Sequence, residues 1–371
     1  MKIINVCFVY DEDLATEEQL LKRYYTTVGW AESLQKKGIE VIVVQRFIRD
    51  YSFKRNDVQY HFIRDRFSGR LKPSQLPIRF LHKLSKLDAD VVHVHSTLFT
   101  PLLRWFLHKK TAIVVQNHGG PRLTGIRGIA YRLMDNVADG LFFTTVEQGK
   151  DWYRTRKLQK KIMPVMEGAN SFNYHERAYA RRITQMKGNP IFIWVGHLNE
   201  NKDPLTVLGG FSELSKKYPE ARLYMLYSSG KLLNEVKAKI GRNEDLQQSV
   251  ILIGKVVHEQ MEMYYNSADY FVLGSHAEGS GYSLSEAMAC GCIPIVTDIP
   301  SFRMMTDDGN LGALWQTGNK DSFIEAATRA MNKSIIDESK ACRDFYNQNL
   351  SFDAIAESSI LHYERIIHCR P

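Results

Sequence analysis

Residues 271–298 read FVLGSHAEGSGYSLSEAMACGCIPIVTD, and this stretch decides the fold. Its apolar start predicts a strand that ends at Gly274, and a glycine-rich turn follows. A helical pattern begins near Tyr282 and stops at Gly291, and Cys292–Val296 has the composition of a second strand. This order predicts a βαβ unit, in which a ligand binds beyond the carboxyl ends of the strands.

Two carboxylates and two glycines give this segment its chemistry. Glu278 lies in the predicted turn, and Glu286 lies on the predicted helix, away from its buried face. Gly279 and Gly281 allow close approach of the backbone to a ligand, and the helix N-terminus offers N–H groups to a phosphate. Ionised carboxylates accept hydrogen bonds from hydroxyls. A nucleotide sugar fits this arrangement; the alternative is two glutamates on a solvated helix face.

The segment resembles the donor-site motif of retaining, family-4-type glycosyltransferases of the GT-B fold, E-G-F-G-x-x-x-x-E-A-M-A-x-G-x-P. Ser280 stands where an aromatic residue is usual, so we expect altered sugar fit and an intact phosphate turn. The matching residues are Glu278, Gly279, Gly281, Glu286, Ala287, Met288, Ala289, Gly291 and Pro294. The resemblance implies an α/β protein with two Rossmann-like domains facing a central cleft, and a final helix that crosses back to the first domain.

The length and composition suit such a protein. The chain has 371 residues, 44% of them hydrophobic, which is enough for two domains. We expect an acceptor domain over 1–168 with 352–371, and a nucleotide-sugar donor domain over 169–351. Scattered cysteines predict reduced thiols and a cytoplasmic protein. The N-terminus reads as a strand and not as a signal peptide, and no apolar run approaches the roughly 20 residues that span a bilayer.

The positive charge is concentrated in one region. The formal net charge is +8, and Arg46–Lys86 is rich in Lys and Arg, with only Asp50, Asp57 and Asp65 against them. Such a surface attracts phosphate-bearing acceptors or an anionic membrane, which predicts peripheral association at the inner face of the membrane. The alternative is a basic surface that only aids solubility. No nucleic-acid-binding module accompanies the charge, so we expect no nucleic-acid partner.

The chain begins like a nucleotide-binding domain. We expect a strand over Ile3–Tyr10, a helix over Tyr24–Lys37 and a strand over Ile39–Gln45. No G-x-G-x-x-G follows the first strand, which argues against a dinucleotide cofactor. The loop Asp11–Leu21 is acidic and extended, so the acceptor contacts of the family cannot be transferred to it.

Histidines follow two predicted strands of the first domain. In the strand Asp90–His95, His93 and His95 share one face, and they either line a cleft or, with a third ligand, bind a metal. A second strand, Thr111–Gln116, leads to His118 beside two glycines, a place suited to ligand contact. The resemblance implies that His118 contacts the transferred sugar at the reaction centre; the alternative is that it only hydrogen-bonds its loop.

A strand over Gly140–Val146 and an interdomain connection over Met163–Tyr174 complete the first domain. The second domain should open with a strand over Pro190–Val195 and a helix from Pro204, with Asp203 as its cap.

Two residues between that strand and helix suit a diphosphate. Lys202 lies beside the predicted helix N-terminus, where an ammonium group would neutralise diphosphate oxygens; the alternative is a solvated loop lysine. The family reads G-R-L-x-x-x-K here, with Arg and Lys both binding the diphosphate. Lys202 matches, whereas His197 replaces the arginine. Because imidazole lacks the bidentate fork of a guanidinium group, donor affinity or its pH dependence should differ.

The resemblance implies the remaining roles. It implies catalysis with no obligatory metal or other cofactor, using a nucleoside-diphosphate sugar as donor and a glycan or lipid-linked acceptor. Glu278 would hold the donor sugar; the alternative is that Glu278 acts as a covalent nucleophile. Glu286 would hold the ribose. Lys255 and Val256 would receive the base. The diphosphate would meet His197, Lys202, Gly279, Ser280, Gly281 and Tyr282.

Two other functional classes stay open at this point. A sugar-nucleotide epimerase or a sugar phosphorylase can share two Rossmann-like domains, and would consume the donor without an acceptor or depend on inorganic phosphate. A non-catalytic sugar-nucleotide-binding protein would bind the donor without turnover, a possibility that the replacement at His197 raises.

Overall fold

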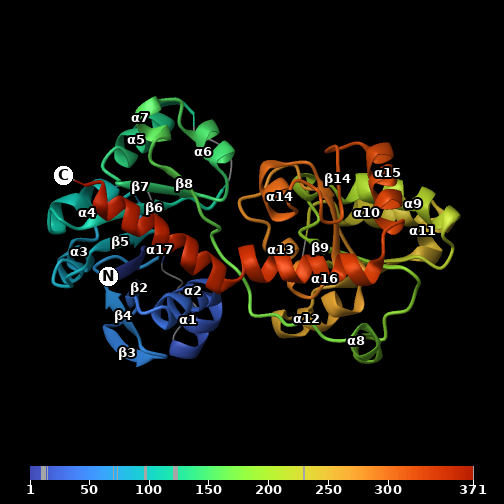
Figure 1. The fold of residues 1–371 in the computed structure, drawn as a ribbon, viewed down its shortest axis with the longest axis horizontal. Coiled ribbons are helices and arrows are strands. Elements are labelled where there is room, and N and C mark those ends of the chain that lie inside the picture. The colour runs from blue at the N-terminus through green and yellow to red at the C-terminus, as the bar shows by residue number, and fades with distance from the viewer. Residues whose placement is uncertain are drawn as a thin grey trace. The chain divides into compact units, whose positions relative to one another are not determined.

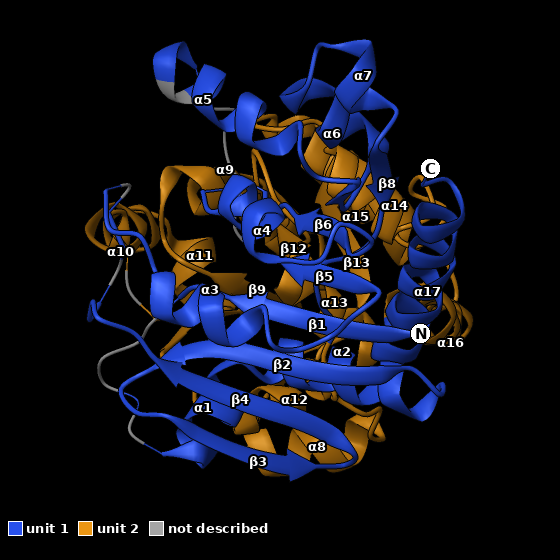
Figure 2. Ribbon diagram, turned by 90° about the vertical axis from the view of Figure 1, so that its left-hand side faces the viewer, with its two compact units in different colours: residues 1–169, 351–371 blue, residues 170–350 orange. Residues whose placement is uncertain are grey.

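The chain folds into two compact units, coloured separately in Figure 2. The computed structural model describes residues 1–9, 14, 16–69, 71–72, 74–95, 98–119, 124–228 and 230–370. Unit 1 comprises residues 1–169 and 351–371, and unit 2 comprises residues 170–350. The sequence placed these divisions after residues 168 and 351.

Unit 1 is built on a sheet whose described strands follow the order β3-β4-β2-β1-β5-β6-β7-β8 (Figure 1). Strands β3 and β4 pair antiparallel, and the other neighbours pair parallel. The central strands are continuous apolar runs, as expected for a parallel sheet covered on both faces. The strands are β1 (Lys2–Cys7), β2 (Glu40–Phe47), β3 (Tyr51–Arg55), β4 (Val58–Arg64), β5 (Val91–Val94), β6 (Ala112–Gln116), β7 (Gly140–Phe143) and β8 (Ile162–Pro164).

Helices flank this sheet, and the last of them comes from the end of the chain (Figure 1). It packs along α2, where Trp30 Nε1 donates to Ser359 Oγ at 3.3 Å and where a side chain at Gly29 would overlap the Phe352 ring. The expectation that the final helix returns to the first unit is confirmed. The helices are α1 (Glu17–Arg23), α2 (Tyr25–Lys36), α3 (Ile78–Leu84), α4 (Thr100–Phe106), α5 (Gly125–Asp135), α6 (Val146–Trp152), α7 (Arg156–Gln159) and α17 (Phe352–His368).

Unit 2 is built on a parallel sheet whose described strands follow the order β11-β10-β9-β12-β13-β14. The segment 271–298 supplies its centre as predicted: a strand, a helix and a parallel strand. The strands are β9 (Ile191–Gly196), β10 (Arg222–Tyr227), β11 (Val250–Gly254), β12 (Tyr270–Leu273), β13 (Ile293–Thr297) and β14 (Ala313–Trp315). The helices are α8 (Arg177–Thr184), α9 (Pro204–Lys217), α10 (Leu233–Gly241), α11 (Glu244–Ser249), α12 (His258–Ser267), α13 (Tyr282–Ala289), α14 (Pro300–Met305), α15 (Lys320–Met331) and α16 (Ile335–Phe345).

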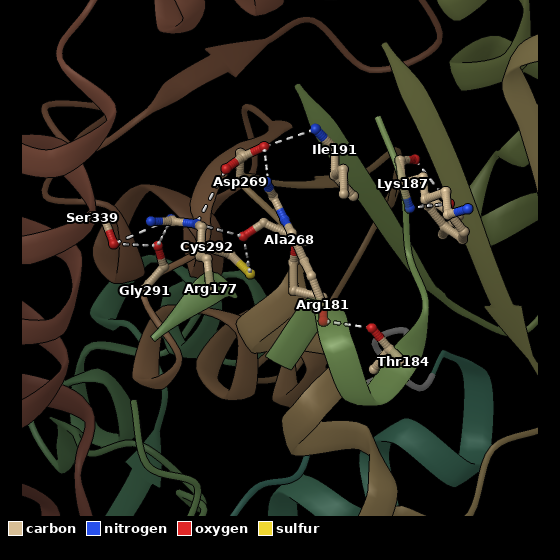
Figure 3. Close-up of polar contacts among 12 residues, drawn as sticks. Arg177, Arg181, Thr184, Lys187, Ile191, Ala268, Asp269, Gly291, Cys292 and Ser339 are labelled. Atoms are coloured by element: carbon tan, nitrogen blue, oxygen red, sulfur yellow. Dashed lines mark hydrogen bonds and ion pairs between the residues drawn. The ribbon is translucent and has the colours of Figure 1, made fainter. Parts of the chain in front are cut away.

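Polar contacts hold the amino ends of the central strands of unit 2 together (Figure 3). Asp269, just before β12, accepts hydrogen bonds from Ile191 N and from Arg181 Nη2, both at 2.8 Å. Arg177 Nη2 donates to the carbonyl of Gly291, just before β13, at 3.0 Å. Helix α8 therefore stabilises this end of the sheet, while the opposite, carboxyl ends are the place where open α/β sheets bind ligands.

The predicted strand Gly140–Val146 is too long. It ends at Phe143 because Thr145 starts α6 in a capping box: Thr145 Oγ1 accepts from Gln148 N at 3.1 Å, and Gln148 Oε1 accepts from Thr145 N at 3.2 Å. The predicted interdomain connection also begins too early, since its first residues lie in β8, which pairs parallel with β7.

The start of the chain also differs from the prediction. Strand β1 ends at Cys7, short of the predicted Tyr10, which lies outside the described residues with positions 11–13 and 15. The loop predicted over Asp11–Leu21 is helical from Glu17, because Thr16 and Gln19 form a capping box.

The predicted basic surface over Arg46–Lys86 is wrong at its first residue. Arg46 is buried, and its guanidinium donates to the carbonyls of Phe8 and Gly69 at 3.1 Å and to that of Phe67 at 2.5 Å. A buried charge needs such partners, and here they hold the loop after β4 against the sheet.

Other cations of this region have carboxylate partners. Asp50 contacts Arg79 at 2.5 Å and Lys83 at 2.7 Å, and Lys54 pairs with Asp57 at 2.7 Å. These ion pairs screen part of the positive charge of the region.

Within the described part of the chain, no helix is long and apolar enough to cross a membrane. The five cysteines, all of them described, form no disulfide.

Candidate functional site

A pocket of about 370 Å³ lies at the carboxyl ends of the strands of unit 2. Strands β9, β10 and β11 end at its edge, and helices α12 and α13 begin there. The structure brings together seven of the residues predicted from the sequence: His197, Lys202, Lys255, Val256, Glu278, Tyr282 and Glu286. Gly279, Ser280 and Gly281 form the turn that leads into α13, but they do not line the pocket.

The ammonium group of Lys202 and the carboxylate of Glu278 form an ion pair, and both side chains are largely shielded from solvent. Asn201 sets their positions: its amide donates to Ala277 O at 3.0 Å and accepts from Ala277 N at 3.1 Å. This two-way pairing aligns the loop before α9 with the loop after β12. Asp203 caps α9 as predicted, accepting from Thr206 N at 3.1 Å.

The turn before α13 requires glycine. Gly281 has φ +68°, and a Cβ built there would lie 2.7 Å from Cε1 of the buried Phe302. No side chain caps the helix, and its first backbone bonds run from Leu284 N and Ser285 N to Gly281 O. The side chain of Ser280 is buried, and its Oγ has no partner among the described residues. Since that hydroxyl does not line the pocket, only the backbone of Ser280 suits the predicted phosphate contact.

Gly281→Ala should lower the free energy of unfolding of unit 2 by about 2 kcal/mol, because left-handed backbone strain adds to the overlap with Phe302. Gly318→Ala is the matched control: its φ is +70°, but no atom lies within 4 Å of the new Cβ. This control variant should lower the free energy of unfolding by only about 1 kcal/mol, the contribution of the left-handed backbone strain. Urea denaturation of both variants measures the difference, and equal losses would contradict the role of Phe302.

Glu286 is buried, which differs from its predicted place away from the packed face of the helix. Its carboxylate accepts from the hydroxyl of Tyr265 at 2.9 Å and lies 3.1 Å from Nε2 of His258. Burial and the adjacent Glu286 carboxylate raise the pKa of Tyr265, which keeps its hydroxyl protonated as a donor. Tyr265 and His258 thus hold the Glu286 carboxylate in place, and the pocket gives a ligand access to it from one side.

Two further contacts shape the rim of the pocket. His197 Nδ1 lies 3.0 Å from the hydroxyl of Ser228, at the end of β10. If Ser228 donates, the other ring nitrogen of His197 carries the hydrogen. Lys255 and Val256 follow Gly254, whose φ of +83° turns the chain at the end of β11.

His118 lies in unit 1, in a hydrogen-bonded row of side chains. Its Nδ1 lies 2.5 Å from the buried carboxylate of Glu167, and its Nε2 lies 2.9 Å from His95 Nδ1. His95 Nε2 in turn lies 2.9 Å from the side-chain amide of Asn5 on β1. His118 thus does more than hydrogen-bond its own loop, because it joins residues of three separate segments.

His93 lies next to this row and contacts the hydroxyl of Tyr363 on α17. Burial, with His118 nearby, lowers the pKa of His93 to about 3, and burial also lowers the pKa of His95. Both rings are therefore neutral near pH 7. Among the described residues, no three His, Cys, Asp or Glu side chains are grouped to hold a metal ion, so the metal alternative for His93 and His95 lacks its third ligand.

A larger, open hollow of about 770 Å³ lies over α9, α10 and α11. Its charged lining is mixed, with Lys239, Arg242 and Lys320 beside Glu213 and Glu235, and it contains none of the predicted site residues. This mixture does not favour a diphosphate.

Comparisons with known families agree with the two-unit architecture. Residues 26–168 match the model of Glycosyltransferase Family 4, and residues 176–349 match the model of Glycosyl transferases group 1. The chain belongs to the family-4 glycosyltransferases. Each half of the family-4 glycosyltransferase pattern thus falls within one of the two units.

Several curated proteins are similar to this family-4 glycosyltransferase. It is 27% identical over 250 residues to a GDP-mannose:cellobiosyl-diphosphopolyprenol alpha-mannosyltransferase of Xanthomonas oryzae, covering 65% of this chain and 63% of the relative. It is 25% identical over 193 residues to an alpha-monoglucosyldiacylglycerol synthase of Streptococcus pneumoniae, covering 49% and 43%. The matches therefore span less than two thirds of these relatives' own lengths.

Solved structures show the same fold at low sequence identity. A glycosyltransferase from Rickettsia africae superposes with a TM-score of 0.68 at 15% identity, covering 100% of this chain and 99% of the other. Anabaena HepE, solved in complex with UDP and glucose, superposes with a TM-score of 0.70 at 11% identity, covering 98% and 100%. This family-4 glycosyltransferase accordingly has the GT-B fold.

Proposed function

We propose that this protein transfers a sugar from a nucleoside-diphosphate sugar to a glycan or lipid-linked acceptor, with retention of the anomeric configuration. The observation that carries the proposal is the pocket of unit 2. It combines the ammonium group of Lys202, the N-terminus of α13 and the buried carboxylate of Glu286 at the carboxyl ends of parallel strands. The ammonium group and the helix N-terminus suit a diphosphate, and the carboxylate suits the hydroxyls of a ribose.

In the proposed complex, Lys202, His197 and the backbone of the turn before α13 bind the diphosphate. Glu286 accepts from the ribose hydroxyls, and the chain at Lys255 and Val256 receives the base. Glu278 holds the donor sugar. Because its carboxylate is engaged by Lys202, Glu278 is better suited to positioning than to attack on the anomeric carbon.

Glycosyl transfer passes through an oxocarbenium-like state while negative charge builds up on the departing diphosphate. Groups fixed beforehand around that charge lower the barrier most. Lys202 meets this requirement, since Asn201 and Glu278 hold its loop and its ammonium group before the donor arrives. In the proposed function His118 contacts the transferred sugar, and no metal or other cofactor takes part.

Relatives support a lipid-linked acceptor. One is named for a diphosphopolyprenol-linked acceptor, and another is named as the synthase of a glucosylated diacylglycerol. A protein that modifies such substrates must meet them at a membrane surface, so we include peripheral association with the inner face of an anionic membrane in the proposed function.

Thermal shift with a panel of UDP-, GDP- and ADP-sugars tests the donor. A ligand at about 100 times its dissociation constant stabilises the folded state by roughly 2.7 kcal/mol, so the preferred donor should stand out. NMR of the product then gives the anomeric configuration. Inversion, donor use without acceptor, or binding without turnover or hydrolysis would each contradict the proposed activity.

His197→Arg should strengthen donor binding. A guanidinium group offers the diphosphate two parallel hydrogen bonds and a permanent charge, whereas an imidazole offers one hydrogen bond. Isothermal titration calorimetry should therefore give a lower dissociation constant for the donor in this variant. His175→Arg, on a histidine that lies outside the pocket, is the control and should leave the dissociation constant unchanged. An unchanged dissociation constant in His197→Arg would contradict the role of His197 in binding the diphosphate.

A further inference from the structure

Helix α5 exposes an apolar face. Ile126, Ile129 and Leu133 lie at positions i, i+3 and i+7 of one helix, and their exposed fractions are 86%, 53% and 65%. At this spacing the three side chains share one face. The neighbouring helix α4 also carries an exposed aromatic residue, Trp105, whose side chain is 85% exposed. In Figure 2, α5 stands out from the rest of unit 1. Isolated exposed apolar residues are ordinary, but a helix face of this kind marks an interaction surface.

The sequence around this face is basic. Between His118 and Asp135 the sequence contains three arginines and no acid. Asp135 itself is buried and accepts a hydrogen bond from the hydroxyl of Tyr153, so its charge does not face solvent at the helix. An apolar face with basic residues and no exposed acid is the composition of helices that lie in the interface of an anionic membrane.

We propose that α5 is the membrane-contacting element of this protein, with Ile126, Ile129 and Leu133 seated in the headgroup region of an anionic bilayer. The inference deepens the proposed function, because it names the surface through which a lipid-linked acceptor would be met. It moves the contact away from Arg46–Lys86, where Arg46 is buried and where Arg79 and Lys83 are both paired with Asp50.

The position of α5 in the chain fits this role. His118 follows β6, and α5 begins at Gly125, so the chain between them spans at most about 25 Å. A bilayer-bound α5 would therefore keep His118 within reach of the headgroup of a membrane-embedded acceptor.

Sedimentation with vesicles tests the proposal. The full chain should bind vesicles of phosphatidylcholine mixed with phosphatidylglycerol more tightly than vesicles of phosphatidylcholine alone. The triple variant Ile126→Ser, Ile129→Ser and Leu133→Ser should lose at least about tenfold in partition coefficient, because it removes most of the apolar contact.

The chain offers a matched control. Ile336, Ile183 and Leu361 are exposed to 79%, 52% and 67%, close to the three residues of α5, but they lie on three different helices. Replacing all three by serine removes the same apolar groups and should leave vesicle binding unchanged. Circular dichroism confirms that both triple variants fold.

Three results would overturn the proposal. The first is wild-type protein that does not bind anionic vesicles, and the second is an α5 variant that binds them like the wild type. The third is an α5 variant whose only change is loss of self-association on a sizing column, because that result would identify a second copy of the chain as the partner of this face. Binding of the UDP-, GDP- and ADP-sugars of the panel is measured in parallel. Protein that binds donor but no vesicle contradicts the membrane surface alone, whereas protein that binds vesicles but no donor contradicts the proposed function alone.

Discussion

Lys202→Ala should weaken donor binding by about 100-fold, because hydrogen bonds to charged groups contribute roughly 1.5–3 kcal/mol each and a tenfold change in affinity corresponds to about 1.4 kcal/mol. The variant loses the ammonium group that would bind the diphosphate. It also leaves the shielded carboxylate of Glu278 without this cation, beside a ligand of the same sign. Isothermal titration calorimetry with the donor found by thermal shift measures the change.

Lys255→Ala is the control for this experiment. Lys255 lines the same pocket, but its side chain is exposed and the proposed contact to the base uses its backbone. Its replacement should leave the dissociation constant nearly unchanged. Equal losses in the two variants would mean that any cation near the pocket attracts the donor, and the specific role of Lys202 would be wrong.

Glu278→Gln should leave donor binding nearly intact and slow transfer by about 10²–10³-fold, the range seen when a group that acts on the transition state is removed. Glutamine keeps the size and one acceptor oxygen of glutamate, but it cannot form the ion pair with Lys202 or balance positive charge on the sugar. Single-turnover kinetics separate this loss in rate from any change in binding. A fully active variant would refute the assignment.

The segment around α13 could be predicted closely because its signals are local. Alternation between apolar strands and a helical pattern, with Gly274 and Gly291 as boundaries, fixes β12, α13 and β13. The positive φ of Gly281 follows from the turn that such a helix needs. Lys202 could be placed for the same reason, since Asp203 and Pro204 mark the start of α9.

The contacts around Glu286 could not be predicted because they join distant positions. Tyr265 and His258 belong to α12, and nothing in their local pattern shows that they face the carboxylate on α13. Only tertiary packing turns a glutamate on an apparently solvated face into a buried one. Arg46 is a similar case: its partners are carbonyl groups of two loops, and a count of charges treats it as surface.

The pairing of the Asn201 side chain with the backbone of Ala277 was not predicted either, although Asn201 lies next to the predicted residue Lys202. An asparagine in a loop has many uses, and its pairing with Ala277 depends on how two strand ends meet in space. Sequence reasoning therefore found the groups that carry the chemistry more readily than those that hold them in place.

The histidine row in unit 1 sets a condition on any sugar that approaches His118. Both ring nitrogens are already engaged, one by Glu167 and the other by His95, so a hydroxyl reaches an imidazole nitrogen only by displacing a neighbour. Because burial keeps His95 neutral and its Nε2 accepts from the Asn5 amide, its Nδ1 donates to His118 Nε2, and the hydrogens of the row point from Asn5 toward Glu167. A hydroxyl that displaces His95 from His118 Nε2 leaves the Nδ1 hydrogen of His95 without its acceptor. Since His95 also contacts Asn5, binding at His118 is linked to β1, in the interior of the sheet.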